Sequence, residues 1–416
     1  MAYSPDSALP QNPRLVVVTG AGIVSPMGRD WAENTAGFRA GRSAFSPVTL
    51  FDVSRQRVGT AGQIDLPEAA PDSGISWKAW GRMDRGSRLA WLAAREALAQ
   101  AGLSGGEMPL IIGTSAAAMP VGEEYYKRAL ANPAQRHTQL SRVETYQATR
   151  QMTDMARALN VHGPQRIVSN ACASGANAIG QAFHLVRSGR ADCVLAGGYD
   201  ALCQMVFAGF DALQALSPSG IPRPFDAARD GLAIGEGAGF VVVESAASAK
   251  ARGARVVAEI LGYGAATDIH HLTQPHPMGD AALMTMQTAC AMAGLAPEQI
   301  DYINSHGTGT PLNDIAEGNA IQRWAGNDVG KIKVSSTKSA IGHLLGGAGA
   351  VESVISLMAL TGQFLPASLN VREADPVCTF DLIREPREAR VRRVLTNSFG
   401  FGGANATLIF GEEGLA

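Results

Sequence analysis

Short apolar, β-branched runs alternate along the chain with longer segments in which apolar residues recur every three or four positions. The short runs predict buried strands, and the longer segments predict helices with one apolar face. The expected strands are 15–19, 109–113, 167–169, 193–196, 240–244, 256–261, 301–304, 332–335 and 407–410, and the expected helices are 83–101, 174–188, 281–294, 314–324 and 347–361. This alternation predicts an α/β protein.

Two strand starts resemble each other, because the runs at 15–22 and 258–264 both end in closely spaced glycines that we interpret as turns. They indicate two halves of similar plan, with an N-terminal tail at 1–13, a first half at 14–250 and a second half at 251–416. No Pro/Ser/Gly linker separates the halves, so we expect them to share one active site. A dinucleotide site at the first glycines is disfavoured, because five residues rather than two separate Gly22 from Gly28.

The composition narrows the class of protein. The 416 residues are 46% hydrophobic, and 35 basic side chains nearly balance 37 acidic ones, which leaves no general positive field for nucleic acid. The most apolar window, 194–216, contains Asp200, Gln204 and Asp211, so no membrane span is expected. Five cysteines without a CxxC pair, and no secretory leader, favour reduced thiols and a cytoplasmic protein.

One cysteine lies at a position that suits a reactive thiol. The segment 169–176, Ser-Asn-Ala-Cys-Ala-Ser-Gly-Ala, places Cys172 between a strand and a helix of small residues. The helix dipole is expected to lower the pKa of this thiol and to supply backbone N–H groups. The alternative is a buried structural cysteine at a helix start. The segment alone does not distinguish a reactive from a structural cysteine, so the other motifs of the chain are needed.

Three further motifs follow strands. They are 304–311 (Asn-Ser-His-Gly-Thr-Gly-Thr-Pro), 336–343 (Ser-Thr-Lys-Ser-Ala-Ile-Gly-His) and 397–405 (Asn-Ser-Phe-Gly-Phe-Gly-Gly-Ala-Asn). Glycines and hydroxyls let a backbone approach an extended polar ligand. A single loop histidine is usually solvated or a core hydrogen-bonder, but the four motifs in this order are specific.

The ordered motifs resemble those of the elongating β-ketoacyl-acyl carrier protein synthases and of polyketide ketosynthases, from Leu15 to Phe410. This resemblance implies a thiolase-like fold, layered αβαβα from two pseudo-equivalent halves. It implies a homodimer, with a heterodimer with a related subunit left open. It also implies acyl carrier protein as partner, substrates carried on its phosphopantetheine arm, no further cofactor and no metal.

By the same resemblance the nucleophile is Cys172, and His306 and His343 assist decarboxylation of a malonyl unit. Lys338, held by Glu352, supports the histidines, and Phe401 supplies an oxyanion amide and an aromatic gate. The implied substrate contacts are Thr308 and Thr310 on the pantetheine arm, Ala116 beside the acyl chain and His271 on the channel wall. A zinc site at His270, His271 and His276 is disfavoured because further ligands are missing.

Related classes differ at single positions. A thiolase is expected to carry a second cysteine within 397–405, an initiating enzyme to carry asparagine where His343 stands, and a chain-length factor to lack Cys172. An active condensing enzyme is therefore favoured over a structural partner subunit. The His-Gly-Thr-Gly-Thr sequence at 306–310 favours specialised polyketide or polyene chains over primary fatty acids, and both stay open.

Partner and chain-length determinants have weaker signals. Lys78, Arg82 and Arg85, with Lys127 and Arg128, match the family's docking patch for an acidic carrier protein, or are ordinary solvated charges. Gln214 replaces a basic residue common in housekeeping enzymes. The alanines 116–118 predict either an open acyl pocket or close packing against a second subunit.

Overall fold

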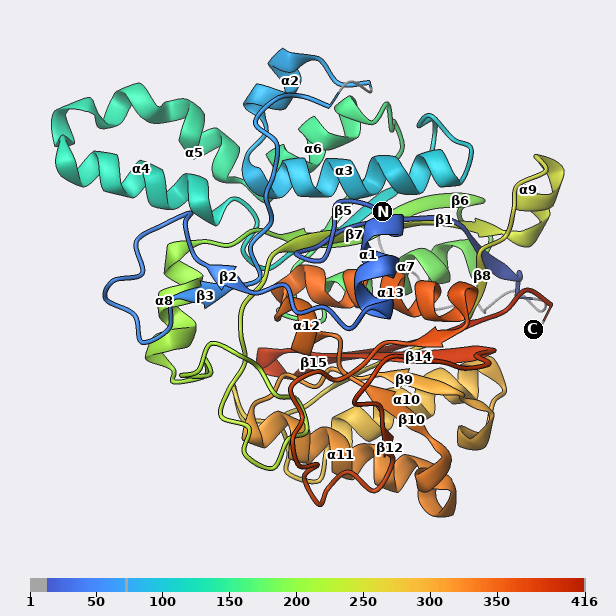
Figure 1. Cartoon of the computed structure of the whole chain (residues 1–416). Coiled ribbons are helices and arrows are strands. Elements are labelled where there is room, and N and C mark those ends of the chain that lie inside the picture. Colours follow the sequence, from blue (N-terminus) through green and yellow to red (C-terminus); the bar gives the residue numbers. More distant parts are fainter. Residues whose placement is uncertain (1–12, 72–73, 415–416) are drawn as a thin grey trace.

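The computed structural model describes residues 13–71 and 74–414, so nearly all of the expected N-terminal tail lies outside the described residues. Its centre is an eleven-stranded sheet in the order β12-β10-β9-β14-β15-β8-β1-β7-β6-β4-β5 (Figure 1). The strands are β1 (Val16–Val24), β4 (Leu110–Gly113), β5 (Gln165–Val168), β6 (Cys193–Asp200), β7 (Gly237–Ser245), β8 (Ala258–Thr267), β9 (Tyr302–Asn304), β10 (Lys333–Ser335), β12 (Asp381–Leu382), β14 (Arg393–Phe399) and β15 (Ala404–Gly411). Two short pairs lie outside it, β2 (Ser46–Pro47) with β3 (Thr60–Ala61) and β11 (Phe364–Leu365) with β13 (Arg387–Glu388).

The sheet is built from two copies of one plan. From the centre outward, one half runs β1-β7-β6-β4-β5 and the other β8-β15-β14-β9-β10. In each half the first two pairings are antiparallel and the next two are parallel. The halves join where β1 pairs antiparallel with β8, at Val17 opposite Glu259. The predicted duplication is thereby confirmed.

Helices complete five layers, which Figure 1 shows from α3 at the top to α10 and α11 at the bottom. α3 packs on β1 and α10 packs on β8, while α7 and α13 fill the layer between the two halves. The helices are α1 (Trp31–Arg39), α2 (Trp77–Arg82), α3 (Arg85–Gln100), α4 (Met119–Ala131), α5 (Leu140–Tyr146), α6 (Ala148–Ala158), α7 (Ser174–Arg187), α8 (Gln204–Ala212), α9 (Ala246–Ala251), α10 (Asp280–Ala293), α11 (Pro311–Ala325), α12 (Lys338–Ile341) and α13 (Ala348–Gly362). The thiolase-like αβαβα architecture is confirmed.

The paired glycines do not form turns, which corrects the prediction. Gly20 and Gly22 lie inside β1, and Gly262 and Gly264 lie inside β8. A methyl group on either β1 glycine would stand 2.1 Å from a carbonyl oxygen of α3, and one on either β8 glycine 2.1 Å from a carbonyl of α10. Glycine is required there because it lets a helix pack directly against strand backbone. The same device at equivalent places in both halves is a further trace of the duplication.

The segment Leu345–Gly362 is long and apolar enough to span a membrane, but 89% of it is buried inside the protein. It contains α13, which occupies the middle layer and buries every residue except the last two. Its one charged side chain, Glu352, is paired with Lys338, so the helix can lie in a protein core. The window 194–216, which the sequence marked as most apolar, instead forms most of β6, all of α8 and a connecting loop.

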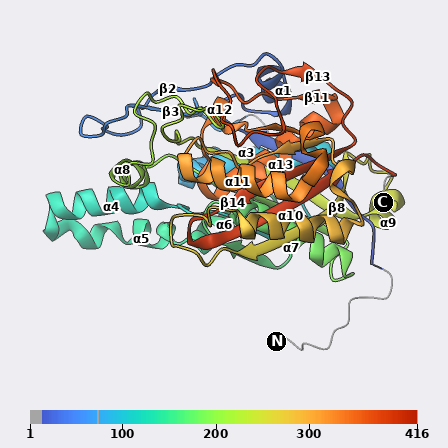
Figure 2. The same ribbon diagram turned by 90° about the horizontal axis from the view of Figure 1, so that it is seen from below.

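One side of the molecule projects. α4 and α5 extend beyond the layered body, as Figures 1 and 2 both show. They carry exposed Tyr126, Leu130 and Leu140, with 64%, 65% and 71% of their surface accessible. An apolar groove of about 820 Å³ runs between α4, α5 and α8, lined in part by Met119 and Met205.

Candidate active site

Four loops at the ends of strands converge on one cavity. Cys172 lies between β5 and α7, His306 follows β9, His343 follows β10 and α12, and Phe401 joins β14 to β15. The cavity has a volume of about 410 Å³. Seven predicted site residues line it, namely Cys172, His271, His306, Thr308, Thr310, His343 and Phe401. Ala116 is not among the described residues that line it.

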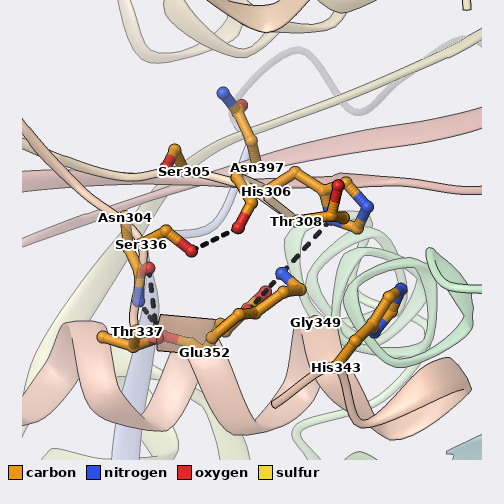
Figure 3. A network of polar contacts seen from close by, with 12 residues as sticks. Asn304, Ser305, His306, Thr308, Ser336, Thr337, His343, Gly349, Glu352 and Asn397 are labelled. Atoms are coloured by element: carbon orange, nitrogen blue, oxygen red, sulfur yellow. Dashed lines mark hydrogen bonds and ion pairs between the residues drawn. The ribbon is translucent and has the colours of Figure 1, made fainter. Parts of the chain in front are cut away.

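The two histidines meet edge to face, with ring centroids 5.3 Å apart and an interplanar angle of 87°. His343 approaches from the helix side and His306 from the strand side (Figure 3). The backbone N–H of Leu345 donates to His343 Nδ1 at 3.1 Å, and the Lys338 ammonium lies 3.3 Å from His306 Nδ1. Because both Nδ1 atoms face donors, each ring carries its proton on Nε2.

Both imidazoles are neutral near pH 7. Burial, with the positive charge of Lys338, lowers the pKa of His306 and of His343 well below the ordinary histidine value. The site therefore holds two uncharged N–H donors. Such donors stabilise a developing negative oxygen without having to lose a proton first.

A buried ion pair supports His306. The Lys338 side chain is 1% exposed and pairs with Glu352 Oε1, from the first turns of α13. Burial raises the pKa of Glu352 to about 7, and the Lys338 charge opposes that rise. The second carboxylate oxygen of Glu352 has no hydrogen-bond partner among the described residues. The pair fixes the ammonium against His306 Nδ1.

The thiol of Cys172 differs from the prediction. Burial raises its pKa to about 11, and this outweighs the lowering by Lys338 and by the backbone N–H groups of Phe401 and of Cys172 itself. The helix start was expected to lower this pKa, but its effect is smaller than the cost of burying a thiolate. The resting side chain is therefore a thiol. The two N–H groups that face its sulfur are the pair expected to form an oxyanion hole.

We expect alkylation of Cys172 by iodoacetamide to accelerate about tenfold per pH unit between about pH 7 and pH 10, because the thiolate fraction rises in that proportion below the pKa. Peptide mapping by mass spectrometry after timed exposure measures the rate at this residue. A rate that levels off by about pH 8 would mean that the helix start and Lys338 outweigh burial.

The glycine-rich loop at 400–403 is tied to a second loop at the cavity mouth. Gly402 N–H donates to Leu272 O at 2.7 Å, and Asp268 N–H donates to Gly403 O at 2.8 Å. The Phe401 ring stacks on Phe210 of α8, with centroids 5.9 Å apart and an angle of 17°. His271 thus stands at the mouth because its loop is bonded to the Phe401 loop.

Buried carboxylates position these loops, and sequence reasoning assigned them no role. Asp200, at the end of β6, accepts N–H groups from Ser115, Ala116, Ala117 and Gly346. It joins the loop that holds Ala116 to the segment that follows His343. The sequence signal for this role was a charged residue, Asp200, at the end of an otherwise apolar run. A charge in such a place is buried only when it has hydrogen-bond or ion-pair partners.

A second carboxylate acts on the His306 loop. Glu317 of α11 accepts the N–H groups of His306 at 2.8 Å and of Gly307 at 2.7 Å, and also the side-chain amide of Asn397. It links two of the motifs. Glu317 and Asp314 lie three residues apart on α11, which begins at the end of the 304–311 motif. Their side chains therefore share one face of that helix.

The predicted docking cations fall into two groups, those that are exposed and those that pair with a carboxylate. Lys78 and Arg82 are exposed on α2 and Lys127 is exposed on α4. Arg128 pairs with Glu124 on the same helix. Arg85 turns inward, which corrects its assignment to the surface patch: its Nε donates to Glu236 Oε2 at 2.8 Å, and the Glu236 side chain is fully buried. A buried carboxylate demands a partner, so Arg85 serves the core.

Two family models match the chain, "Beta-ketoacyl synthase, N-terminal domain" over residues 14–249 and "Beta-ketoacyl synthase, C-terminal domain" over 257–372. The chain belongs to the β-ketoacyl synthase family. This ketosynthase is 37% identical over 412 residues to the 3-oxoacyl-[acyl-carrier-protein] synthase 2 of Synechocystis sp., covering 95% of this chain and 97% of the relative.

Solved structures resemble the ketosynthase over the whole fold. The ishigamide ketosynthase/chain length factor aligns with a TM-score of 0.89 and 36% identity, over 97% of this chain and 100% of that one. A chain of a solved complex, in which a type II polyketide synthase acyl carrier protein is bound to its ketosynthase, also aligns. Its TM-score is 0.85 at 28% identity, over 96% of this chain and 100% of that one. The family that the motifs indicated is confirmed.

Proposed function

We propose that this ketosynthase is an elongating β-ketoacyl-acyl carrier protein synthase. It loads an acyl chain onto Cys172 and extends the chain by decarboxylative condensation with malonyl-acyl carrier protein. The observation that carries the proposal is the convergence of one thiol, two neutral Nε2–H donors and two backbone N–H donors on a single cavity. This set of donors suits acyl transfer followed by enolate formation.

In the first half-reaction, the sulfur of Cys172 attacks the acyl thioester on the carrier protein. The N–H groups of Cys172 and Phe401 donate hydrogen bonds to the thioester oxygen as negative charge develops on it. The carrier thiol leaves with the proton that Cys172 gives up, and the acyl group remains on the enzyme. Because the pKa of Cys172 is raised to about 11, the resting thiol still carries this proton when the carrier thioester binds.

In the second half-reaction, malonyl thioester loses CO₂ and its electron pair becomes an enolate. His306 and His343 each donate an Nε2–H to the enolate oxygen, and Lys338 holds His306 in that tautomer. The enolate carbon attacks the acyl carbon on Cys172, the carbon–sulfur bond breaks, and the thiolate takes up a proton from the solvent. No external base is needed, because decarboxylation supplies the carbanion.

The phosphopantetheine arm fits the polar wall of the cavity. The hydroxyls of Thr308 and Thr310 lie 2.9 Å from each other at the wall, where they can bond an amide-rich arm. His271 Nδ1 accepts the N–H of Thr273, so its Nε2 is the ring nitrogen left to face a substrate. No further cofactor or metal is required by this chemistry.

We also propose partners and a location, which the exposed surface and one solved relative support. Acyl carrier protein docks on the exposed cations Lys78, Arg82 and Lys127, and a related ketosynthase was solved with its carrier protein. A second copy of this chain covers the exposed apolar residues of α4 and α5, because surfaces of that kind usually lie in interfaces. The five cysteines are free thiols, as suits a cytoplasmic enzyme. The boundary between the two halves of the chain is proposed to lie near residue 250. The product is proposed to be a fatty acid, polyene or polyketide chain.

The purified chain alone tests this function. Incubated with acyl- and malonyl-carrier protein, it is expected to run as a dimer and to release CO₂ and β-ketoacyl-carrier protein in equal amounts. If product forms only when a related second subunit is added, the protein is half of a heterodimer. If it forms in neither case and Cys172 resists alkylation at high pH, the chain is a structural partner and the proposal fails.

The acyl chain is proposed to pass beside Ala116. The loop 114–118 lies against Gly346, near His343. The contact is so close that a methyl group on Gly346 would stand 2.5 Å from Ser115 N. The loop then leads directly into Met119, which lines the apolar groove between α4 and α8. Ala116 is buried in this loop, and we infer that its small side chain lets a long or rigid acyl chain pass.

Replacing Ala116 by phenylalanine is expected to lower kcat/KM for long acyl donors by about tenfold or more, and to spare acetyl and butyryl donors, because added volume blocks only the deeper path. Condensation assays with carrier proteins of graded chain length measure this. An unchanged chain-length profile in a folded variant would refute the role of Ala116 and support close packing instead.

A further inference from the structure

The residue before the nucleophile has an unusual backbone. Ala171 has a φ of +54°, in the left-handed region that side chains with a Cβ avoid. It connects the end of β5 to the start of α7 and presents Cys172 at the tip of a sharp turn. A strained residue at such a place persists only when its neighbours hold it.

Ser174 is the neighbour that holds it. Its hydroxyl donates to Ala171 O at 2.6 Å and accepts the N–H of Asn170 at 2.9 Å. Its own N–H also donates to Ala171 O, at 3.1 Å. The side chain is completely buried, so no solvent competes for these bonds. One hydroxyl therefore bonds the peptide groups on both sides of the turn.

The turn and the oxyanion loop touch. A methyl on Gly400 would stand 3.1 Å from Cys172 N and 3.3 Å from the Cβ of Ala171. On the other side, a methyl on Gly113 would stand 2.3 Å from the backbone of Ser174. A change of φ at Ala171 would thus move the Cys172 N–H relative to the Phe401 loop, and a misplacement of about 1 Å can cost on the order of 10²-fold in rate.

We propose that Ser174 is a positioning residue: its hydroxyl holds Ala171 in the left-handed conformation that aims the sulfur and N–H of Cys172 at the acyl group. This rests on the proposed function and adds a residue to it. Ser174 is not among the described residues that line the cavity, and the hydrogen-bond partners of its hydroxyl are backbone groups, so its effect passes through the geometry of the turn. Glycine at 171 would adopt the same φ without a Cβ penalty and would reduce the need for the clamp.

The test compares Ser174→Ala with the double variant Ser174→Ala/Ala171→Gly. Single-turnover acyl loading of Cys172, followed by intact-protein mass, is expected to slow by about tenfold or more in the single variant and to recover to within about threefold in the double variant. Alkylation of Cys172 by iodoacetamide is expected to change less than loading, because that reaction needs no oxyanion hole.

Ser353→Ala is the matched control, because Ser353 is also fully buried and its hydroxyl donates to a backbone carbonyl, that of Gly349, at 2.7 Å. It is expected to lower the melting temperature while keeping the loading rate. Normal loading by a folded Ser174→Ala protein would overturn the inference. So would a double variant that regains the wild-type melting temperature but not the rate. Failure of the wild-type protein to load would instead refute the proposed function.

Discussion

Cys172→Ala is expected to abolish condensation, with a loss on the order of 10⁴-fold or more, because the acyl group then has no atom to which it can be transferred. Cys172→Gln is expected to lose condensation equally but to retain decarboxylation of malonyl-carrier protein. The glutamine amide oxygen can occupy the oxyanion hole as the acyl thioester oxygen would, and His306 and His343 remain in place. Release of CO₂ and formation of β-ketoacyl product, measured separately, distinguish the two variants.

Cys290→Ala is the matched control for these variants, because Cys290 is a buried thiol on α10 that is not among the described residues that line the cavity. It is expected to keep the condensation rate within about threefold of the wild-type rate. Condensation at the normal rate by Cys172→Ala would remove this residue from the mechanism. Equal loss in Cys290→Ala would point to general damage.

His306→Ala and His343→Ala are each expected to slow malonyl decarboxylation by about 10²-fold or more, because each removes one Nε2–H donor from the enolate oxygen. Acyl loading of Cys172 is expected to fall much less, since its oxyanion is held by backbone N–H groups. The two half-reactions are measured separately, as CO₂ release and as the acyl adduct on the protein.

His184→Ala is a suitable control, because His184 lies on α7 against Tyr263 and does not line the cavity. It is expected to leave both half-reactions within about threefold of the wild-type rates. Equal losses of loading and decarboxylation in the His306 and His343 variants would mean that these rings maintain the site rather than stabilise the enolate.

Much of the fold could be predicted from periodicity. The five expected helices appear as α3, α7, α10, α11 and α13, with ends shifted by no more than three residues. Helices α4 and α5 were missed because they bury none of their residues and so have no apolar face packed against the body, whereas α6 was missed although it buries Met152 and Met155. The glycines of β1 and β8 were read as turns because a sequence cannot show that a helix will approach a strand so closely.

The site was predicted through the order of its motifs rather than through any single residue. The convergence of the motifs on one cavity agrees with that reading, and the tautomers of His306 and His343 follow only from the donors that face them. Two features required coordinates. The pKa of Cys172 depends on a balance between burial and charge, and Arg85 could be separated from its exposed neighbours only by the buried carboxylate of Glu236.

The most direct test of the mechanism is the mass of the intact protein before and after malonyl-carrier protein is added. Purified ketosynthase incubated with acyl-carrier protein is expected to gain one acyl group, mapped to Cys172. On addition of malonyl-carrier protein this adduct is expected to disappear as an equal amount of β-ketoacyl product forms. An adduct on another residue, or one on Cys172 that malonyl-carrier protein does not discharge, would contradict the mechanism.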